Sequence, residues 1–175
     1  DRSMDGSKFD RDSYALKFEK TNLSPRIKSL KINISRTHID HIMDNYSLRP
    51  LTQTSMPMSM EVKRTTTSAG TAFVIPLSWH SQITAGADYQ KNIHSGNMVT
   101  GSRNPHAKPL SRDMTFTNYG VFAEYKNQIT RTDRFLAGIR ADRLEVTYAK
   151  YPGRKDHDYT YGAFMRYEHS NSPAA

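Results

Sequence analysis

Hydrophobic and polar residues alternate with a period of two along most of this chain, and no other sequence feature constrains the fold as much. Successive side chains of a β-strand point to opposite faces, so the alternation favours strands over helices. The regular segments lie at 13–19, 30–37, 83–90, 118–126, 135–142 and 159–168, and a less regular one lies within 58–73. The sequence therefore predicts an all-β protein of about seven strands, joined as an antiparallel meander.

The polar phase of these strands contains glycine together with charged residues. Gly86, Gly120, Gly138 and Gly162 all fall on it, beside Asp, Glu, Arg and Gln. The inner face of a β-sandwich has to be apolar, so this composition argues against a sandwich core. It suits the wet interior of a transmembrane β-barrel whose other face contacts outer-membrane lipid.

The connections and the tyrosines agree with a barrel. Short connections at 22–26, 74–79 and 127–133 alternate with longer ones at 44–57, 91–114 and 150–158, as the two rims of an outer-membrane barrel require. Several tyrosines sit at strand ends on the apolar phase, where an interfacial girdle is expected: Tyr14, Tyr89, Tyr125, Tyr159 and Tyr167. A soluble antiparallel domain, in which Tyr simply has a high strand propensity, is the alternative interpretation.

Composition excludes some functions and leaves others open. The 175 residues contain no Cys, which rules out a disulfide scaffold, a thiolate cluster and a Cys nucleophile. The net charge of +8 permits a soluble basic domain that binds nucleic acid, but the cations are spread over strands and loops without a basic stripe, so we predict no nucleic-acid partner. Hydrolase and phosphate-loop motifs are missing from the sequence, and we predict no enzymatic activity.

The strand count suggests an incomplete barrel. Bacterial single-chain barrels have an even number of strands, and an open sheet edge is not tolerated in lipid. The residues 171–175 (NSPAA) form a turn that would lead into a further strand. We therefore expect residues 1–175 to be an internal segment of a larger barrel, with a small complete barrel serving as an adhesin or anchor as another possibility.

Three segments resemble a known family. The pair 119–125 (YGVFAEY) and 135–142 (FLAGIRAD), together with 83–90 (ITAGADYQ), resembles the barrel strands of TonB-dependent outer-membrane receptors. The resemblance implies a plugged barrel of roughly 22 strands in the outer membrane of a Gram-negative bacterium. It also implies partners outside these residues, namely an N-terminal plug domain and TonB, which pulls on the plug to release the substrate.

A narrower candidate site lies at 41–49 (HIMDNYSLR). If the phase of the 30–37 strand continues, His41 and Met43 share the lumen face about 7 Å apart, at the entrance to a long loop. An imidazole plus a thioether favours a copper ion, Cu(I) in particular, over Mg²⁺ or Ca²⁺. The segment also resembles the copper-receptor subfamily, in which a His-x-Met pair binds copper and the plug supplies the remaining sulfur ligands. We therefore predict that His41 and Met43 are metal ligands and that the substrate is copper.

Other residues and substrates remain open at this stage. Met56, Met58 and Met60 could pass soft ions toward the lumen, or they could contact lipid, because they share parity with Val62. A further group, His94, Met98 and His106, falls in a predicted loop and is expected to be solvated. The same architecture could instead serve a siderophore or cobalamin, for which aromatic and Arg contacts at the rim are expected.

Overall fold

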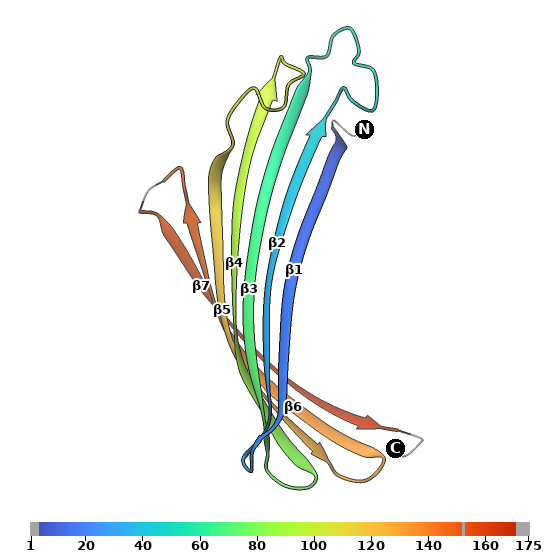
Figure 1. Cartoon of the computed structure of the whole chain (residues 1–175), viewed down its shortest axis with the longest axis vertical. Helices are drawn as coiled ribbons and strands as arrows, with labels where there is room; N and C mark the ends of the chain where they lie inside the picture. Colours follow the sequence, from blue (N-terminus) through green and yellow to red (C-terminus); the bar gives the residue numbers. More distant parts are fainter. Residues whose placement is uncertain (1–3, 152, 171–175) are drawn as a thin grey trace.

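The computed structural model describes residues 4–151 and 153–170, and all seven regular elements in these ranges are strands (Figure 1). They are β1 (Asp5–Ser24), β2 (Ile27–Asp44), β3 (Met58–Pro76), β4 (Ser81–Thr100), β5 (Ser111–Gln128), β6 (Asp133–Tyr148) and β7 (Lys155–His169). The sheet order is β1-β2-β3-β4-β5-β6-β7, and every neighbouring pair is antiparallel. The predicted seven-stranded meander is confirmed. No helix in the described ranges is long and apolar enough to cross a membrane.

The strands are longer than the alternation suggested. They contain 15 to 20 residues, whereas crossing a bilayer takes about 9–11. The predicted loop at 91–114 is mostly strand, because β4 continues to Thr100 and β5 begins at Ser111, leaving loop 101–110. The expectation was wrong here because both faces of these strand ends carry polar residues, so hydropathy no longer alternates while the backbone pairing continues.

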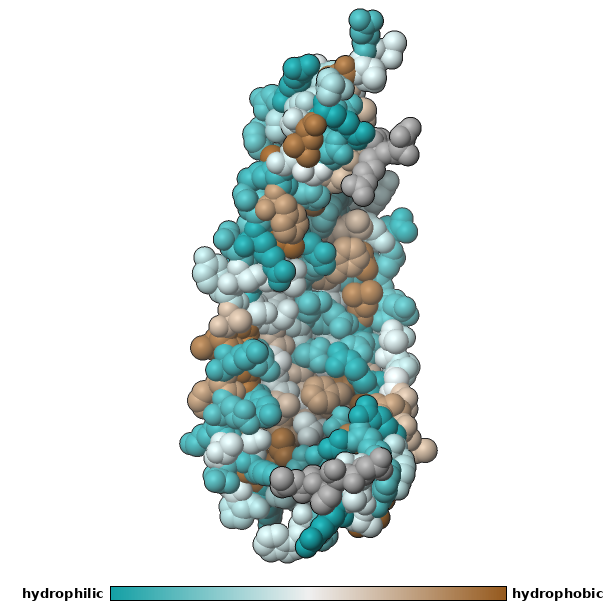
Figure 2. Space-filling model, turned by 90° about the vertical axis from the view of Figure 1, so that its right-hand side faces the viewer, coloured by the Kyte–Doolittle hydropathy of each residue, from teal (hydrophilic) through white to brown (hydrophobic). Residues whose placement is uncertain are grey.

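The register assigns every side chain to one of two faces, since directly paired residues of an antiparallel sheet lie on the same face. We call outer the face that carries the apolar belt, which is formed by Leu16, Ile32, Ile34, Phe73, Ala87, Val121, Ile139 and Ala163. The inner face is the opposite one. Val121 and Ile139 are 58% and 66% exposed, so these apolar side chains are available for contact with a membrane. In the side view of Figure 2, hydrophobic residues are interleaved with hydrophilic ones.

Aromatic residues border the apolar belt on the outer face. Toward the long loops, the rings of Tyr89 and Tyr119 lie 5.3 Å apart, in a row that continues through Arg143 on β6. Toward the short turns, the rings of Tyr125 and Phe135 lie 6.5 Å apart. Tyr119 and Tyr125 are separated by about 20 Å along β5, which is close to the height of about 25 Å of a membrane apolar band. The girdle tyrosines thus lie on the predicted face.

The inner face is polar, and its glycines make room for large neighbours. Arg140 on β6 bonds Asp88 on β4 at 2.8 and 2.9 Å and Asp142 at 2.6 and 2.7 Å. This cluster spans β5 at Gly120, where a Cβ would collide with all three of these side chains. The phase of glycine and charge therefore shares one face, as the sequence predicted, and at Gly120 it holds a cluster of ion pairs, whereas Gly86 and Gly138 make room for the rings of Phe122 and Phe164.

A charged side chain in the apolar belt tests the assignment of the outer face. We expect Val121→Arg to destabilise the membrane-inserted protein by about 2–4 kcal/mol, since an Arg at mid-membrane depth meets hydrocarbon. Thr117→Arg is the matched control, because Thr117 lies on the same face of β5 above the girdle and should change stability by at most about 1 kcal/mol. Heat-modifiable gel migration of the intact protein, titrated with urea, measures both variants. Equal losses would contradict the assignment.

Candidate soft-metal site on the inner face

The inner face of β2, β3 and β4 gathers methionines at the end that carries the long loops. Met43 pairs with Met60, and Met60 pairs with Met98, so three thioethers form one row across three strands. We call Met43, Met60 and Met98 the methionine row. His41 lies next to it on β2 and pairs with Val62. Val62 and Met60 therefore lie on the inner face together with His41. The alternative drawn from the sequence, in which Met60 and Val62 contact lipid, is wrong.

The surroundings of His41 leave its imidazole accessible and oriented. The ring of Phe9 meets it edge-on at a centroid distance of 5.6 Å. Gly6 faces it from β1, and a Cβ there would lie only 3.4 Å from His41 Nε2. Gly6 and Phe9 share the inner face because a β-bulge shifts the register between Gly6 and Lys8. Bulges of this kind re-aim side chains beside functional sites.

The residues that follow Met43 hold the loop that begins there. Asp44 Oδ1 accepts hydrogen bonds from the backbone N–H groups of Tyr46 (3.0 Å) and Ser47 (2.6 Å), which fixes a tight turn. Asn45 reaches across the loop, donating from Nδ2 to the Met56 carbonyl (3.0 Å) and accepting at Oδ1 from the Met58 N–H (2.8 Å). The segment 44–47 thus places Met56 and Met58 opposite the end of β2.

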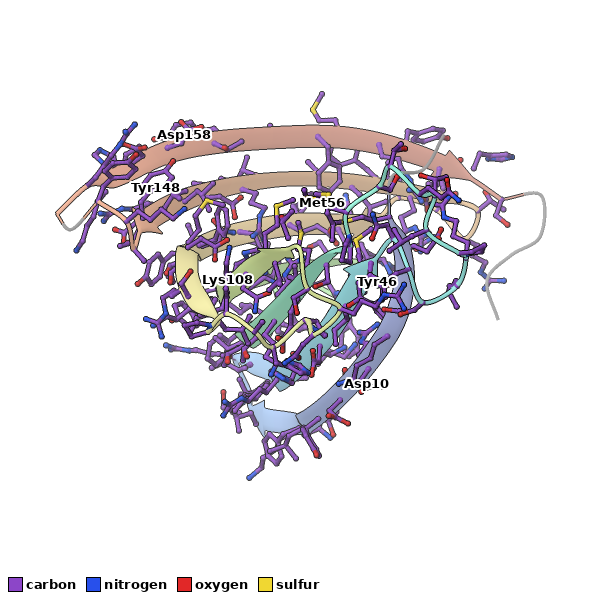
Figure 3. All side chains as sticks on the ribbon, turned by 90° about the horizontal axis from the view of Figure 1, so that it is seen from above. Asp10, Tyr46, Met56, Lys108, Tyr148 and Asp158 are labelled. Carbon is purple, nitrogen blue, oxygen red and sulfur yellow. The ribbon has the colours of Figure 1, made fainter. Side chains whose placement is uncertain are left out.

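Loop 45–57 is also tied to its neighbours. The Tyr46 hydroxyl donates to the Arg103 carbonyl at 2.7 Å, which joins this loop to loop 101–110. Arg49 Nε lies 2.7 Å from Asp5 Oδ2 at the start of β1. Viewed from above, the sheet is strongly curved (Figure 3), and loops 45–57 and 101–110 lie at the same end of it (Figure 1). The 41–49 segment therefore combines two soft donors with the anchors of their loop.

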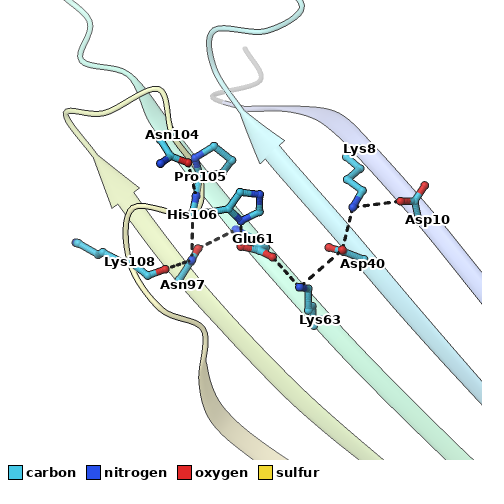
Figure 4. Close-up of polar contacts among 10 residues, drawn as sticks. All are labelled: Lys8, Asp10, Asp40, Glu61, Lys63, Asn97, Asn104, Pro105, His106 and Lys108. Atoms are coloured by element: carbon cyan, nitrogen blue, oxygen red, sulfur yellow. Dashed lines mark hydrogen bonds and ion pairs between the residues drawn. The ribbon is translucent and has the colours of Figure 1, made fainter.

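The structure separates two histidines that the sequence placed together in a loop. His94 lies in β4 on the inner face, where its Nδ1 is 2.9 Å from Asp113 Oδ2. His106 lies in loop 101–110, which folds over the outer face, and its Nδ1 is 2.8 Å from Oε2 of the buried Glu61 (Figure 4). Only His94 shares a face with His41 and the methionine row.

The outer face above the belt carries a self-neutralising polar network. Lys63 lies 3.1 Å from Glu61 and 3.9 Å from Asp40, and Lys8 lies 2.9 Å from Asp40 (Figure 4). Within residues 4–151 and 153–170, no three His, Asp or Glu side chains are grouped so that they could hold a metal ion. The candidate donors are instead one imidazole and the neighbouring thioethers of the inner face.

Comparison with known proteins identifies the family. The family described as "TonB dependent receptor-like, beta-barrel" matches residues 1–174. The chain belongs to the TonB-dependent receptors. This family consists of receptors and transporters, and the recognition made from the strand motifs is confirmed.

Solved structures give the same result. The structure titled "Copper transporter OprC" superposes with a TM-score of 0.88 at 29% identity, covering 98% of this chain and 30% of that one. The ferric preacinetobactin receptor BauA from Acinetobacter baumannii gives a TM-score of 0.61 at 10% identity, covering 89% of this chain and 27% of that one. This receptor chain thus spans less than a third of the length of either structure. No curated protein matches it significantly.

Removing the cross-loop clamp should loosen the loop while leaving the sheet intact. We expect Asn45→Ala to remove both side-chain bonds to 56–58 and to weaken the local structure by about 1–3 kcal/mol. Hydrogen exchange across 45–58 in the intact receptor should then accelerate, with no change in β4. Gln53→Ala in the same loop is the matched control. Unchanged exchange in Asn45→Ala would show that the clamp does not hold the loop.

Proposed function

We propose that this chain is part of the barrel of a TonB-dependent receptor that takes up copper, with His41 and Met43 as ligands for the transported ion. The observation that carries the proposal is the placement of His41, Met43 and Met60 on one face at the loop end of adjacent strands. Imidazole and thioether donors favour copper, and Cu(I) most of all, over hard cations. The likeness to a copper transporter over 98% of the chain supports the same substrate.

The proposal includes the surroundings of the chain. Residues 1–175 form a segment of the barrel domain in the outer membrane of a Gram-negative bacterium, with lipid against the apolar belt. The inner face meets the receptor's plug domain, which contributes further sulfur ligands, and TonB acts through that plug. These partners lie outside the described residues, and nucleic acid is not among them.

The geometry favours capture and release over catalysis. His41 is held edge-on by Phe9, so little side-chain freedom is lost when its imidazole binds a metal ion. Met43 and its pairing partner Met60 are flexible and polarisable, which suits ligand exchange with a soft ion. On an open wall, few protein donors bind the ion, and ligands from a movable plug complete its coordination. The ion is then released when the plug moves.

Uptake of a siderophore or cobalamin is the second candidate function. The fold is shared with the siderophore receptor BauA, and at 10% identity that likeness concerns the fold alone. A siderophore receptor does not require thioethers, whereas the inner face here presents the methionine row at its loop end. The two candidates differ in whether uptake depends on soft donors.

Substitution of both ligands in the intact receptor separates these candidates. We expect His41→Ala with Met43→Ala to lower Cu(I) affinity at least about 100-fold, since losing direct ligands should exceed the 10–100-fold effects of outer-shell changes. Competition with a chromophoric Cu(I) chelator under anaerobic conditions measures the affinity, and TonB-dependent uptake of radioactive copper measures transport.

The matched control is His38→Ala with Met165→Leu. His38 lies on the outer face of β2, bonded to Thr65 at 3.1 Å, and Met165 lies on the outer face of β7. This pair should bind and transport copper as the wild type does. Unchanged copper affinity in the His41/Met43 variant would refute the copper site, and TonB-dependent uptake of an iron siderophore by both variants would support the second candidate.

A further inference from the structure

Two arginines border His41 on the inner face. Arg11 on β1 and Arg64 on β3 both pair with Ile39, which lies two residues before His41 on β2. Each arginine is therefore a diagonal neighbour of His41, at about 7–8 Å, a separation that long side chains can span. All of these side chains share one face, because directly paired residues do so and residues two apart along a strand do so.

Neither arginine has a carboxylate partner. Within residues 4–151 and 153–170, Arg64 has no ion pair or side-chain hydrogen bond, and Arg11 donates from Nε only to the Ser13 hydroxyl, at 3.3 Å. The other inner-face arginines of the seven strands all contact carboxylates: Arg134 and Arg166 contact Glu168, and Arg140 contacts Asp88 and Asp142. In the described part of the chain, the two guanidinium groups beside His41 are therefore the ones left to bind a ligand.

The wall around these arginines is positively charged. Between them and the long loops, the inner face of β1 to β4 contains no Asp or Glu in the described residues. Toward the short turns, the first acidic residues on this face are Glu19, which lies 3.5 Å from Lys31, and Asp88, which is bonded to Arg140. On β5, Asp113 is engaged by His94. No carboxylate of these strands thus offsets the two guanidinium groups.

This charge bears on the form in which a metal ion can reach His41. A bare cation is repelled by two neighbouring positive groups, whereas an ion already bound to an anionic ligand is attracted. The guanidinium group presents a planar fork of donors that matches a carboxylate. Thiolate is the ligand that suits the soft ion Cu(I). The complex that fits this wall is therefore held by a thiolate and carries carboxylates that remain unbound.

We propose that the receptor binds Cu(I) as an anionic complex with a small thiol that bears two carboxylates, and that Arg11 and Arg64 bind those carboxylates. This form of the substrate presupposes the proposed copper uptake, in which His41 and Met43 contact the ion. The thiolate neutralises the charge of Cu(I), so the two carboxylates leave two negative charges, equal to the positive charge of the two guanidinium groups. The ion keeps its thiolate and its oxidation state when it binds.

The spacing of the arginines favours two carboxylates over one. Arg11 and Arg64 are separated by β2, which places their backbones about 10 Å apart. Their long side chains can therefore close on a small ligand from opposite sides, above Ile39. A ligand with two carboxylates engages both guanidinium groups, whereas a ligand with one carboxylate leaves one of them unpaired.

Binding of a radiolabelled thiol to the intact, detergent-purified receptor tests this proposal. The probes are the Cu(I) complexes of mercaptosuccinate, which has two carboxylates, and of mercaptoethanol, which has none. Anaerobic equilibrium dialysis counts copper and thiol separately. We expect the wild type to retain mercaptosuccinate together with copper. We also expect it to bind this complex at least about 10-fold more tightly than the mercaptoethanol complex, since two charge-assisted contacts are added.

Substitution of the arginines should remove this preference. We expect Arg11→Gln/Arg64→Gln to weaken binding of the mercaptosuccinate complex about 10–100-fold and to leave binding of the mercaptoethanol complex unchanged. Arg11→Lys/Arg64→Lys keeps the charge and should recover part of the affinity. Lys17→Gln/Lys126→Gln is the matched control, because it removes the same charge from the inner face toward the short turns, and it should bind as the wild type does. Heat-modifiable migration shows that each variant is folded.

The outcomes separate this proposal from the copper site itself. Equal affinity of the wild type for the two complexes, unaltered in the arginine variant, would overturn the anionic complex and leave the roles of His41 and Met43 standing. Retention of copper without labelled thiol would also overturn it, because the bare ion would then be the form that binds. An equal loss in the lysine control would overturn the assignment to Arg11 and Arg64, because net charge alone would account for it.

A further variant tests the ligands of the ion. Unchanged binding of the mercaptosuccinate complex in His41→Ala/Met43→Ala, with loss in the arginine variant, would refute the roles of His41 and Met43 and support the arginine contacts. Loss of copper together with its thiol in both variants would support both proposals, because the ion and its ligand would then bind as one complex.

Discussion

The register of β2, β3 and β4 determines which chemistry the sheet presents at its loop end. Side chains repeat every two residues, so a slip of one residue in β3 would move Met60 from the inner face to the outer face. Sixteen unbroken pairs from Ser29↔Val74 to Asp44↔Ser59 prevent such a slip. The apolar belt reinforces them, because the same slip would turn Phe73 to the inner face. The belt toward the short turns thus helps to fix the position of the methionine row toward the long loops.

Of the three register shifts within residues 4–151 and 153–170, one lies between Thr21 and Ser24 near the β1–β2 turn, and the other two lie beside the inner-face histidines His41 and His94. One lies between Gly6 and Lys8 and brings Gly6 next to His41, and the other brings Asp113 next to His94. An additional residue lets neighbouring side chains share a face, which strict alternation forbids. Beside His41 the bulge places a glycine, which has no side chain, and beside His94 it places the carboxylate of Asp113. The strands are therefore regular through the apolar belt, and two of their irregularities lie beside the inner-face histidines.

Alternation sufficed to predict the all-β meander and the inner face of His41 and Met43, because both follow from residues close in sequence. The methionine row could not be predicted in this way. Met43, Met60 and Met98 belong to three strands, and their alignment depends on the register across a thirteen-residue loop. His94 and Asp113 meet only through a bulge, which has no signal in hydropathy. The sequence thus identified candidate donor residues, but it could not show which of them are adjacent across strands.

At the loop end of the sheet, the carboxylates of Glu61 and Asp40 and the thioethers of the methionine row lie on opposite faces. On the outer face, Glu61 and Asp40 are paired with Lys63 and Lys8, so these carboxylates are already neutralised. On the inner face, the thioethers of the methionine row have no competing charge of their own. A hard divalent ion would have to displace lysines to reach oxygen ligands, whereas a soft ion meets neutral sulfur and imidazole. The proposed preference for a soft ion therefore follows from the same two-residue period that builds the barrel wall.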